Sequence, residues 1–155
     1  MLPEQMQIIK ATVPLLQQHG TRITQVFYSQ MFAEHPELRQ QFDMAAQADG
    51  SQQKRLAGAI LAYAANIDRL EQLGAAVERI AQRHVETNVL PEQYPIVGRH
   101  LLAAIQTVLG DVVTPEILDA WSTAYQELAD ILILREQELY DQRTAAGDLA
   151  GVAVN

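Results

Sequence analysis

The segment Val77-Glu-Arg-Ile-Ala-Gln-Arg-His84-Val-Glu86 carries the most informative pattern in the chain. Val77, Ile80 and Ala81 precede His84 by seven, four and three residues, so on an α-helix they share its face. The imidazole is therefore expected to point inward along an apolar stripe. A buried neutral imidazole needs a hydrogen-bond partner or a metal ion. The pattern leaves two interpretations open, a core histidine satisfied by hydrogen bonds or a metal ligand.

The remaining sequence also shows helical periodicity, without the alternating pattern of a half-buried strand. Cap and breaker residues divide it into long helices expected at about residues 3–20, 21–35, 51–70, 73–86, 96–109 and 115–140. A short helix or turn is expected at 36–41, followed by an irregular link to residue 50. The sequence thus predicts an all-α domain over residues 1–142 and a flexible C-terminal tail over 143–155.

Composition excludes several classes of function. With 155 residues, the chain has the length of one domain. A formal net charge of -8 argues against nucleic acid or an anionic membrane as a partner. No cysteine is present, so disulfides, thiolate nucleophiles and cysteine-ligated metal sites are excluded. No secretory signal or membrane-spanning run is apparent, and we expect a cytoplasmic protein without integral membrane association.

The other three histidines have sufficient structural explanations. His19 lies at a predicted helix end, His35 before a proline, and His100 at the edge of an apolar stripe. Without a His-x-x-x-His or Glu-x-x-His pair, a dedicated zinc or di-iron site is not expected. A single inward imidazole in an all-helical domain leaves haem as the cofactor that needs one protein ligand. Tyr28 is expected to be partly buried, and its hydroxyl then needs a partner.

Further motifs occur in order along the chain: Ile9-Lys-Ala-Thr-Val-Pro14, Phe27-Tyr28, Met31-Phe32, His35-Pro36-Glu37, Phe42-Asp-Met44, Gln52, Leu56, Tyr63-Ala-Ala-Asn66-Ile67, Pro91-Glu-Gln-Tyr94, Leu118-Asp-Ala-Trp121, Tyr125 and Glu136. With the His84 segment, they resemble the bacterial single-domain haemoglobins of the Vitreoscilla type and the globin domains of flavohaemoglobins. The resemblance covers about residues 1–142. It implies a globin fold of six to seven helices enclosing haem b.

The resemblance also implies roles for individual residues. His84 becomes the proximal ligand of the haem iron, and its imidazole is linked to Tyr94 and Glu136. Tyr28 and Gln52 become the distal polar pair that holds the bound gas. These four polar residues, Tyr28, Gln52, Tyr94 and Glu136, are the implied catalytic groups. Further cofactor-binding positions are implied at Phe42, Leu56, Val97, Tyr125 and Arg83; the last would pair with a haem propionate, or be an ordinary surface arginine.

The implied activity is reversible dioxygen binding, with oxidation of nitric oxide to nitrate when a separate NAD(P)H-dependent flavin reductase supplies electrons. An oxygen carrier or delivery protein without turnover is the alternative, and a haem-free partner or sensor module is a third. The sequence departs from flavohaemoglobins after the globin domain, and we expect no flavin or nicotinamide domain to follow. Gln53 stands where the Vitreoscilla protein has a proline. Whether the chain forms a homodimer is left open.

Overall fold

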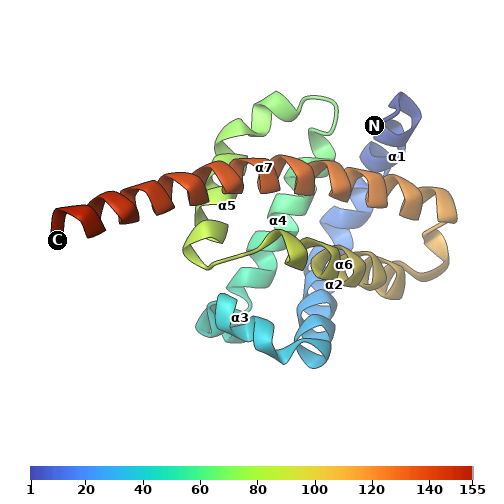
Figure 1. Cartoon of the computed structure of the whole chain (residues 1–155). Coiled ribbons are helices and arrows are strands. Elements are labelled where there is room, and N and C mark those ends of the chain that lie inside the picture. Colours follow the sequence, from blue (N-terminus) through green and yellow to red (C-terminus); the bar gives the residue numbers. More distant parts are fainter. Residues whose placement is uncertain (155) are drawn as a thin grey trace.

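The computed structural model describes the backbone of residues 1–154 and the side chains of residues 1–146. This part of the chain contains helices and no strand, which confirms the all-α prediction (Figure 1). The α-helices are α1 (Pro3–Ala11), α2 (Val13–Glu34), α3 (Met44–Asp49), α4 (Ser51–Ala65), α5 (Gly74–Glu86), α6 (Tyr94–Leu109) and α7 (Pro115–Val154). Four 3-10 turns join them: η1 (Pro36–Gln41), η2 (Leu70–Leu73), η3 (Pro91–Gln93) and η4 (Gly110–Val112).

The first helix ends earlier than predicted. It ends at Ala11. Thr12, which follows it, has a buried hydroxyl that donates to the Ile9 carbonyl at 2.6 Å, and α2 then runs on through Gly20. A Cβ at Gly20 would lie 3.4 Å from the Cβ of Ala57 in α4. Gly20 therefore does not end a helix; its small size allows α2 and α4 to approach closely.

Helix α3 was not predicted. It occupies part of the segment expected to be irregular, and Asp43 caps it by accepting hydrogen bonds from the backbone N–H groups of Ala45 and Ala46. The following helix, α4, begins at Ser51 as predicted, and its N-cap is Gly50, with φ of 81°. A capped short helix thus precedes Gln52, the predicted distal glutamine, where the sequence suggested an irregular link.

Helix α7 begins as predicted and ends later. The Thr114 hydroxyl accepts from the N–H of Ile117 at 3.3 Å, and Pro115 occupies the first turn. The helix continues past Tyr140, because residues 141–146 contain no strong helix breaker. Its last residue is Val154. The flexibility expected of residues 143–155 stays a prediction, and Asn155 lies outside the described residues.

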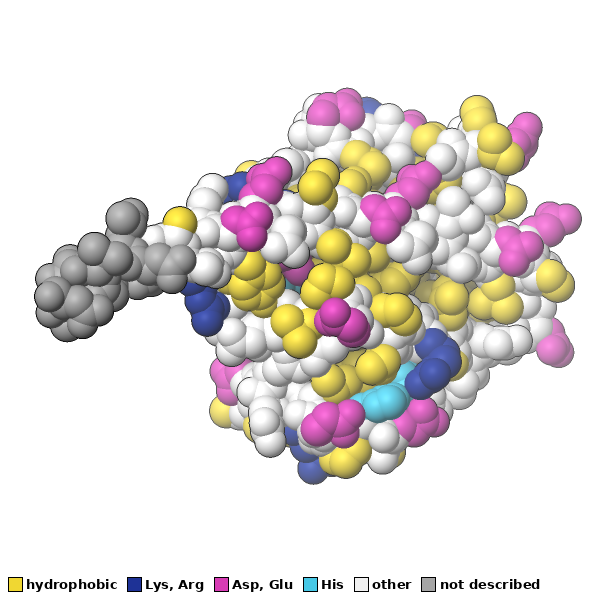
Figure 2. Space-filling model, in the orientation of Figure 1, with side chains coloured by type: hydrophobic (Ala, Val, Ile, Leu, Met, Phe, Trp, Pro, Cys, Tyr) yellow, Lys and Arg dark blue, Asp and Glu magenta, His cyan; other side chains and the backbone are white. Residues whose placement is uncertain are grey.

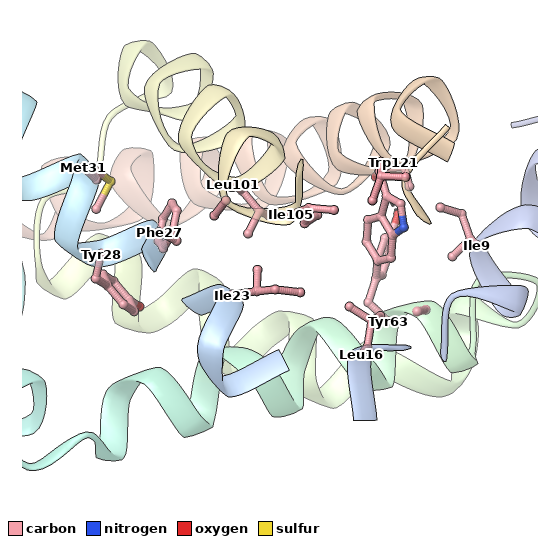
Figure 3. Packing of buried hydrophobic residues seen from close by; sticks show 14 of the residues in the cluster. Ile9, Leu16, Ile23, Phe27, Tyr28, Met31, Tyr63, Leu101, Ile105 and Trp121 are labelled. Atoms are coloured by element: carbon pink, nitrogen blue, oxygen red, sulfur yellow. Dashed lines mark hydrogen bonds between the residues drawn. The ribbon is translucent and has the colours of Figure 1, made fainter. Parts of the chain in front are cut away.

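The main core forms where α2 packs against both α4 and α6. Figure 3 shows its side chains, with Trp121 of α7 beside Tyr63 of α4. The Tyr63 hydroxyl donates to the Ala124 carbonyl at 2.7 Å, which joins α4 to α7 inside the core. A smaller cluster between α5 and α7 contains Ala81 and Leu132. None of the described helices is long and apolar enough to cross a bilayer.

Gly98 in α6 is the position where added volume should be most harmful. A Cβ there would lie 2.5 Å from Cε1 of Tyr125. We expect Gly98→Ala to lower the free energy of unfolding by about 1–3 kcal/mol, because the ring must be displaced. Gly58→Ala is the matched control: a Cβ added at Gly58 would have no neighbouring atom within 4 Å, so it should stabilise α4 by about 1 kcal/mol. Urea unfolding measures the unfolding free energy of each variant. Equal changes in Gly98→Ala and Gly58→Ala would contradict the Gly98–Tyr125 contact.

Candidate functional site

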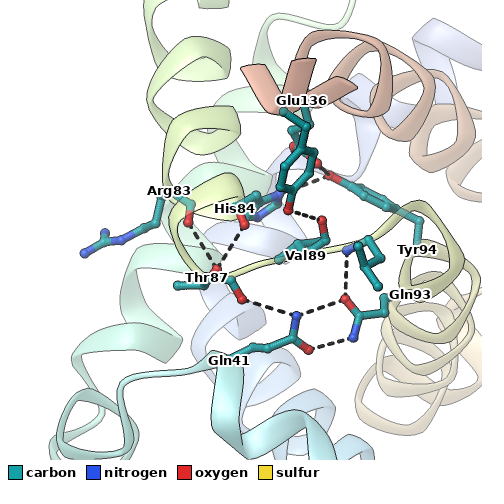
Figure 4. A network of polar contacts seen from close by, with 10 residues as sticks. Gln41, Arg83, His84, Thr87, Val89, Gln93, Tyr94 and Glu136 are labelled. Carbon is teal, nitrogen blue, oxygen red and sulfur yellow. Dashed lines mark hydrogen bonds and ion pairs between the residues drawn. The ribbon is translucent and has the colours of Figure 1, made fainter. Parts of the chain in front are cut away.

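His84, Tyr94 and Glu136 form one hydrogen-bonded cluster (Figure 4). Nδ1 of His84 lies 3.0 Å from the Tyr94 hydroxyl and 3.0 Å from Oε2 of Glu136. The Tyr94 hydroxyl lies 2.8 Å from both carboxylate oxygens. Glu136 is only 3% exposed, so its carboxylate is stabilised by these two neighbours and not by water. Three different helices, α5, α6 and α7, therefore meet at one buried carboxylate.

The donors and acceptors of this cluster determine the tautomer of His84. A carboxylate only accepts hydrogen bonds, so Tyr94 donates its proton to Glu136. Burial, followed by the hydrogen bond and charge of Glu136, raises the pKa of Tyr94, which keeps the phenol protonated. Nδ1 of His84 must then carry the other proton and donate it. The lone pair of the ring is left on Nε2, which has no hydrogen-bond partner among the described residues.

The environment of Nε2 suits a flat, apolar cofactor with a metal at its centre. The His84 side chain is 32% exposed although it lies on the apolar face of α5. Val77 and Ile80 on that face are only half-buried, as are Phe42, Leu56 and Val97 on other elements. An imidazole with its Nδ1–H held by a carboxylate is a typical metal ligand. These residues fit haem held by one protein ligand.

A bidentate ion pair between α5 and α7 aligns the two helices that carry His84 and Glu136. Arg135, adjacent to Glu136, donates from Nε and Nη2 to the two oxygens of Glu78 at 2.7 and 2.8 Å. This hydrogen bonding, helped by Gln82, lowers the pKa of Glu78 from 4.5 to about 2. Both side chains are about one-third exposed, so water and salt weaken the pair.

The Glu78 pair should make stability depend on pH in the acid range. Because the pKa is lower in the folded protein, the stabilisation is complete above about pH 4.5 and is lost as pH falls towards 2. The difference in unfolding free energy between the wild type and Glu78→Gln should therefore be constant near neutrality and shrink below about pH 4.5. Urea titrations across this range measure it, with Glu71→Gln as an exposed control. If the difference in unfolding free energy between the wild type and Glu78→Gln stayed unchanged at pH 2, the lowered pKa of Glu78 would be contradicted.

The segment that follows His84 is held by contacts that the sequence did not reveal. Asn88 adopts a positive φ of 61°. The Tyr140 hydroxyl donates to the Val89 carbonyl at 2.6 Å, and Arg143 donates to the Val85 carbonyl at 3.1 Å. Both come from the part of α7 that lies at or beyond its predicted end. The extension of α7 thus fixes the backbone that carries His84.

A pair of glutamines attaches η1 to the same segment. Gln41 and Gln93 exchange amide hydrogen bonds of 3.0 and 2.6 Å, and Gln41 also donates to the Asn88 carbonyl at 2.9 Å (Figure 4). η1 leads directly to Phe42. The glutamine pair therefore fixes the position of Phe42 relative to the His84 segment. Glutamine pairs have no recognisable spacing, so sequence inspection could not have found this one.

The predicted distal residues come together between α2 and α4. Burial raises the pKa of Tyr28 to about 12, against the opposing influence of Gln52 and Arg55, so its hydroxyl is a permanent donor at neutral pH. The Tyr28 ring lies 5.6 Å from that of Phe42 and 5.8 Å from that of Phe32. A hollow of about 300 Å³ lies beside it, lined in part by Phe32 and by residues of α3. A protonated phenol is thus available in largely apolar surroundings.

Gln53, where the Vitreoscilla protein has a proline, is an ordinary part of α4 and is 9% exposed. Its amide donates to the backbone carbonyl and side chain of Gln47 at 3.2 and 3.0 Å. Its own backbone carbonyl accepts from the hydroxyl of Thr24 in α2 at 2.9 Å. Gln53 therefore joins α2, α3 and α4 next to the distal pair.

Tyr125 and Arg83 are two of the predicted cofactor-binding residues, and they lie in different surroundings. The Tyr125 hydroxyl donates to the Tyr94 carbonyl at 2.6 Å, so Tyr125 supports the start of α6; its contact with a cofactor stays a prediction. Arg83 is exposed, and its guanidinium points away from the polar network in Figure 4. Its pairing with a propionate likewise stays a prediction.

Comparison with known proteins places the chain in a family. The Globin family model matches residues 25–132. A flavohemoprotein of Deinococcus radiodurans is 58% identical over 139 residues, covering 90% of this chain and 34% of that protein. One of Rhizobium meliloti is 54% identical over 145 residues, covering 93% of this chain and 36% of that protein. The chain thus spans about a third of the length of these relatives.

Solved structures of similar length give the same result. A bacterial globin from Campylobacter jejuni is 44% identical with a TM-score of 0.85, over 90% of this chain and 99% of that one. An engineered carbene transferase derived from a putative nitric oxide dioxygenase of Rhodothermus marinus is 34% identical with a TM-score of 0.87, over 93% and 99% of the two chains. The resemblance seen in the sequence is confirmed: the chain belongs to the globin family.

Proposed function

We propose that this globin oxidises nitric oxide to nitrate with dioxygen, using an electron from a separate flavin reductase. Its cofactor is haem, which supplies an iron centre that binds dioxygen and other small gases. The net reaction combines one nitric oxide, one dioxygen and one electron into one nitrate ion. The globin match and the flavohemoprotein relatives support the haem protein itself.

The His84–Tyr94–Glu136 cluster is the observation that carries the proposal. Glu136 accepts hydrogen bonds from both other members, at 3.0 Å from His84 and 2.8 Å from Tyr94. A buried carboxylate behind an imidazole increases the basicity of Nε2 and hence its electron donation. Strong proximal donation favours chemistry on dioxygen over simple reversible storage. An oxygen carrier would not need a charged partner at this position.

The distal residues would supply hydrogen bonding. Tyr28 remains protonated near neutral pH because burial raises its pKa to about 12. A donor placed in apolar surroundings stabilises negative charge that develops on a bound small molecule. Gln52 lies close enough to the same hydroxyl to oppose the rise in its pKa. The phenol and the amide together would therefore hold dioxygen and retard its release.

A flavohemoglobin that is longer than this chain suggests where the electron for nitric oxide oxidation comes from. A flavohemoglobin of Malassezia yamatoensis, solved with bound FAD and heme, is 34% identical with a TM-score of 0.82, over 91% of this chain and 38% of that one. In such a protein the flavin and the haem belong to one polypeptide. We infer that a flavin reductase using a nicotinamide cofactor supplies this globin.

Glu136→Gln tests the proposal because it removes the charge and keeps the shape. We expect sustained nitrate formation, measured with a flavin reductase and NAD(P)H, to fall by about 10- to 100-fold, as is usual when a partner of a metal ligand is lost. The midpoint potential of the iron should rise at the same time. Glu138→Gln is the control, since Glu138 contacts Arg135 and not His84.

The same assay separates the enzyme from the carrier. Nitrate production that continues through many turnovers, and that depends on Glu136, supports the proposal. A stable oxygen complex that yields nitrate once, and does not turn over with any reductase tried, would favour an oxygen carrier. Unchanged turnover in Glu136→Gln would remove the role assigned to the cluster.

A further inference from the structure

Glu34, His35 and His100 converge at the C-terminal end of α2, away from the His84 site. Glu34 and His35 end that helix, and His100 comes from α6. One ligand atom from each of the three lies within 4.8 Å of the others. Figure 2 shows histidine surface on this face of the molecule with acidic and basic side chains around it. Neither the proposed nitric oxide chemistry nor the haem site uses these residues.

His100 has an unsatisfied nitrogen that points into this cluster. Its side chain is only 5% exposed, and Nε2 lies 3.2 Å from Oε2 of Glu34. The geometry nevertheless gives Nε2 no hydrogen bond among the described residues. Buried polar atoms are nearly always paired, so an orphaned one that faces a carboxylate indicates a missing partner.

His35 presents a second nitrogen lone pair to the same place. Nη2 of Arg99 lies 3.3 Å from Nε2 of His35, and because a guanidinium only donates, Nε2 is the acceptor. The proton of the ring is therefore on Nδ1, which lies 3.4 Å from Oε1 of Glu37. Arg99 also lies 3.9 Å from Glu34. The Arg99 guanidinium thus lies beside two of the three residues, and its side chain is exposed and free to move into water.

We propose that Glu34, His35 and His100 form an accessory site for a divalent transition-metal ion, with Zn²⁺ as the reference ion. Two imidazoles and one carboxylate are a donor set that suits zinc, and not magnesium or calcium, which prefer oxygen ligands alone. Zn–N and Zn–O distances of about 2.0–2.2 Å require the ligand atoms to be roughly 3.3 Å apart. Exposed Glu34 and half-buried His35 can close the present spacing by side-chain rotation, with water as the fourth ligand.

Binding would have a mechanical consequence. The ion would tie the end of α2, just before η1, to the middle of α6. Because these ligands are assembled only in the folded chain, zinc should stabilise the fold by mass action. The site therefore predicts a zinc-dependent rise in melting temperature that is independent of haem chemistry.

The test is isothermal titration of the haem-loaded full chain, without a histidine tag, with Zn²⁺. We expect one ion per chain. His35→Ala and Glu34→Ala should each weaken binding by at least about tenfold. Arg99→Gln should tighten it several-fold, because a competing cation is removed. His19→Ala is the control, since His19 lies on α2 outside the cluster, and it should leave both zinc affinity and the thermal shift unchanged.

Both ligand substitutions are at the surface or half-buried, so the Soret spectrum can verify that each variant is folded. Loss of the zinc-dependent thermal shift in His35→Ala and Glu34→Ala, with the shift retained in His19→Ala, supports the site. Absence of bound zinc after equilibrium dialysis of the wild type would overturn it. Equal affinities in the wild type and His35→Ala, or weaker binding in Arg99→Gln, would do the same.

Discussion

Replacement of His84 by alanine is expected to abolish normal haem ligation. His84 supplies the one nitrogen lone pair that the cluster leaves unpaired, on Nε2. The substitution also removes a hydrogen-bond donor from Glu136, a carboxylate that is 3% exposed. Leaving a buried charge without one of its partners is destabilising by about 3 kcal/mol or more. Absorption titration with hemin should therefore show a weak and altered Soret band.

Added imidazole distinguishes loss of the ligand from loss of the fold. It should enter the cavity in His84→Ala, donate to Glu136, and restore a histidine-type spectrum. His19→Ala serves as the control and should bind hemin like the wild type. A wild-type ferrous spectrum in His84→Ala without added imidazole would refute the assignment of His84.

Replacement of Tyr28 by phenylalanine should speed the dissociation of dioxygen by roughly 10- to 100-fold. The factor corresponds to the loss of a hydrogen bond to a charged group, worth about 1.5–3 kcal/mol. Tyr28 is 5% exposed and protonated, so no water replaces its hydroxyl easily. Stopped-flow displacement of dioxygen by carbon monoxide measures the rate. Turnover should fall as well, because dioxygen is held for a shorter time.

Tyr63→Phe is the matched control for this experiment. Tyr63 is also 5% exposed, but its hydroxyl donates to the Ala124 carbonyl, between α4 and α7. Its removal should lower the unfolding free energy by about 1–3 kcal/mol and leave the dissociation rate unchanged. If Tyr28→Phe and Tyr63→Phe both released dioxygen at the wild-type rate, the distal role proposed for Tyr28 would be refuted.

The sequence pattern identified His84 well, because its evidence is local. Val77, Ile80 and Ala81 fall on the same face through helical periodicity, and α5 has nearly the predicted bounds. Its partners could not be found in that way. Tyr94 and Glu136 are 10 and 52 residues further along the chain, and no spacing rule joins them. Only the resemblance to bacterial haemoglobins brought these three residues together before the structure did.

Other features were missed because they depend on tertiary contacts. Gly20 looked like a helix terminator, but its size serves the approach of Ala57 in α4. The last helix was expected to end near Tyr140, because the residues after 143 include few large apolar groups, although Tyr140 and Arg143 donate hydrogen bonds to the backbone around His84. The Glu34–His35–His100 cluster joins two helices that are distant in sequence. Such contacts are set by helix packing and leave no periodic signal.

The most direct test of the site is an absorption spectrum of the purified protein in its oxidised form, after reduction with dithionite, and after exposure of the reduced protein to oxygen. We predict a Soret band that shifts through a five-coordinate ferrous state to a stable oxygen complex. That result requires haem, an axial histidine and an open distal side lined by Tyr28. The absence of a Soret band even after hemin is added would contradict the whole account.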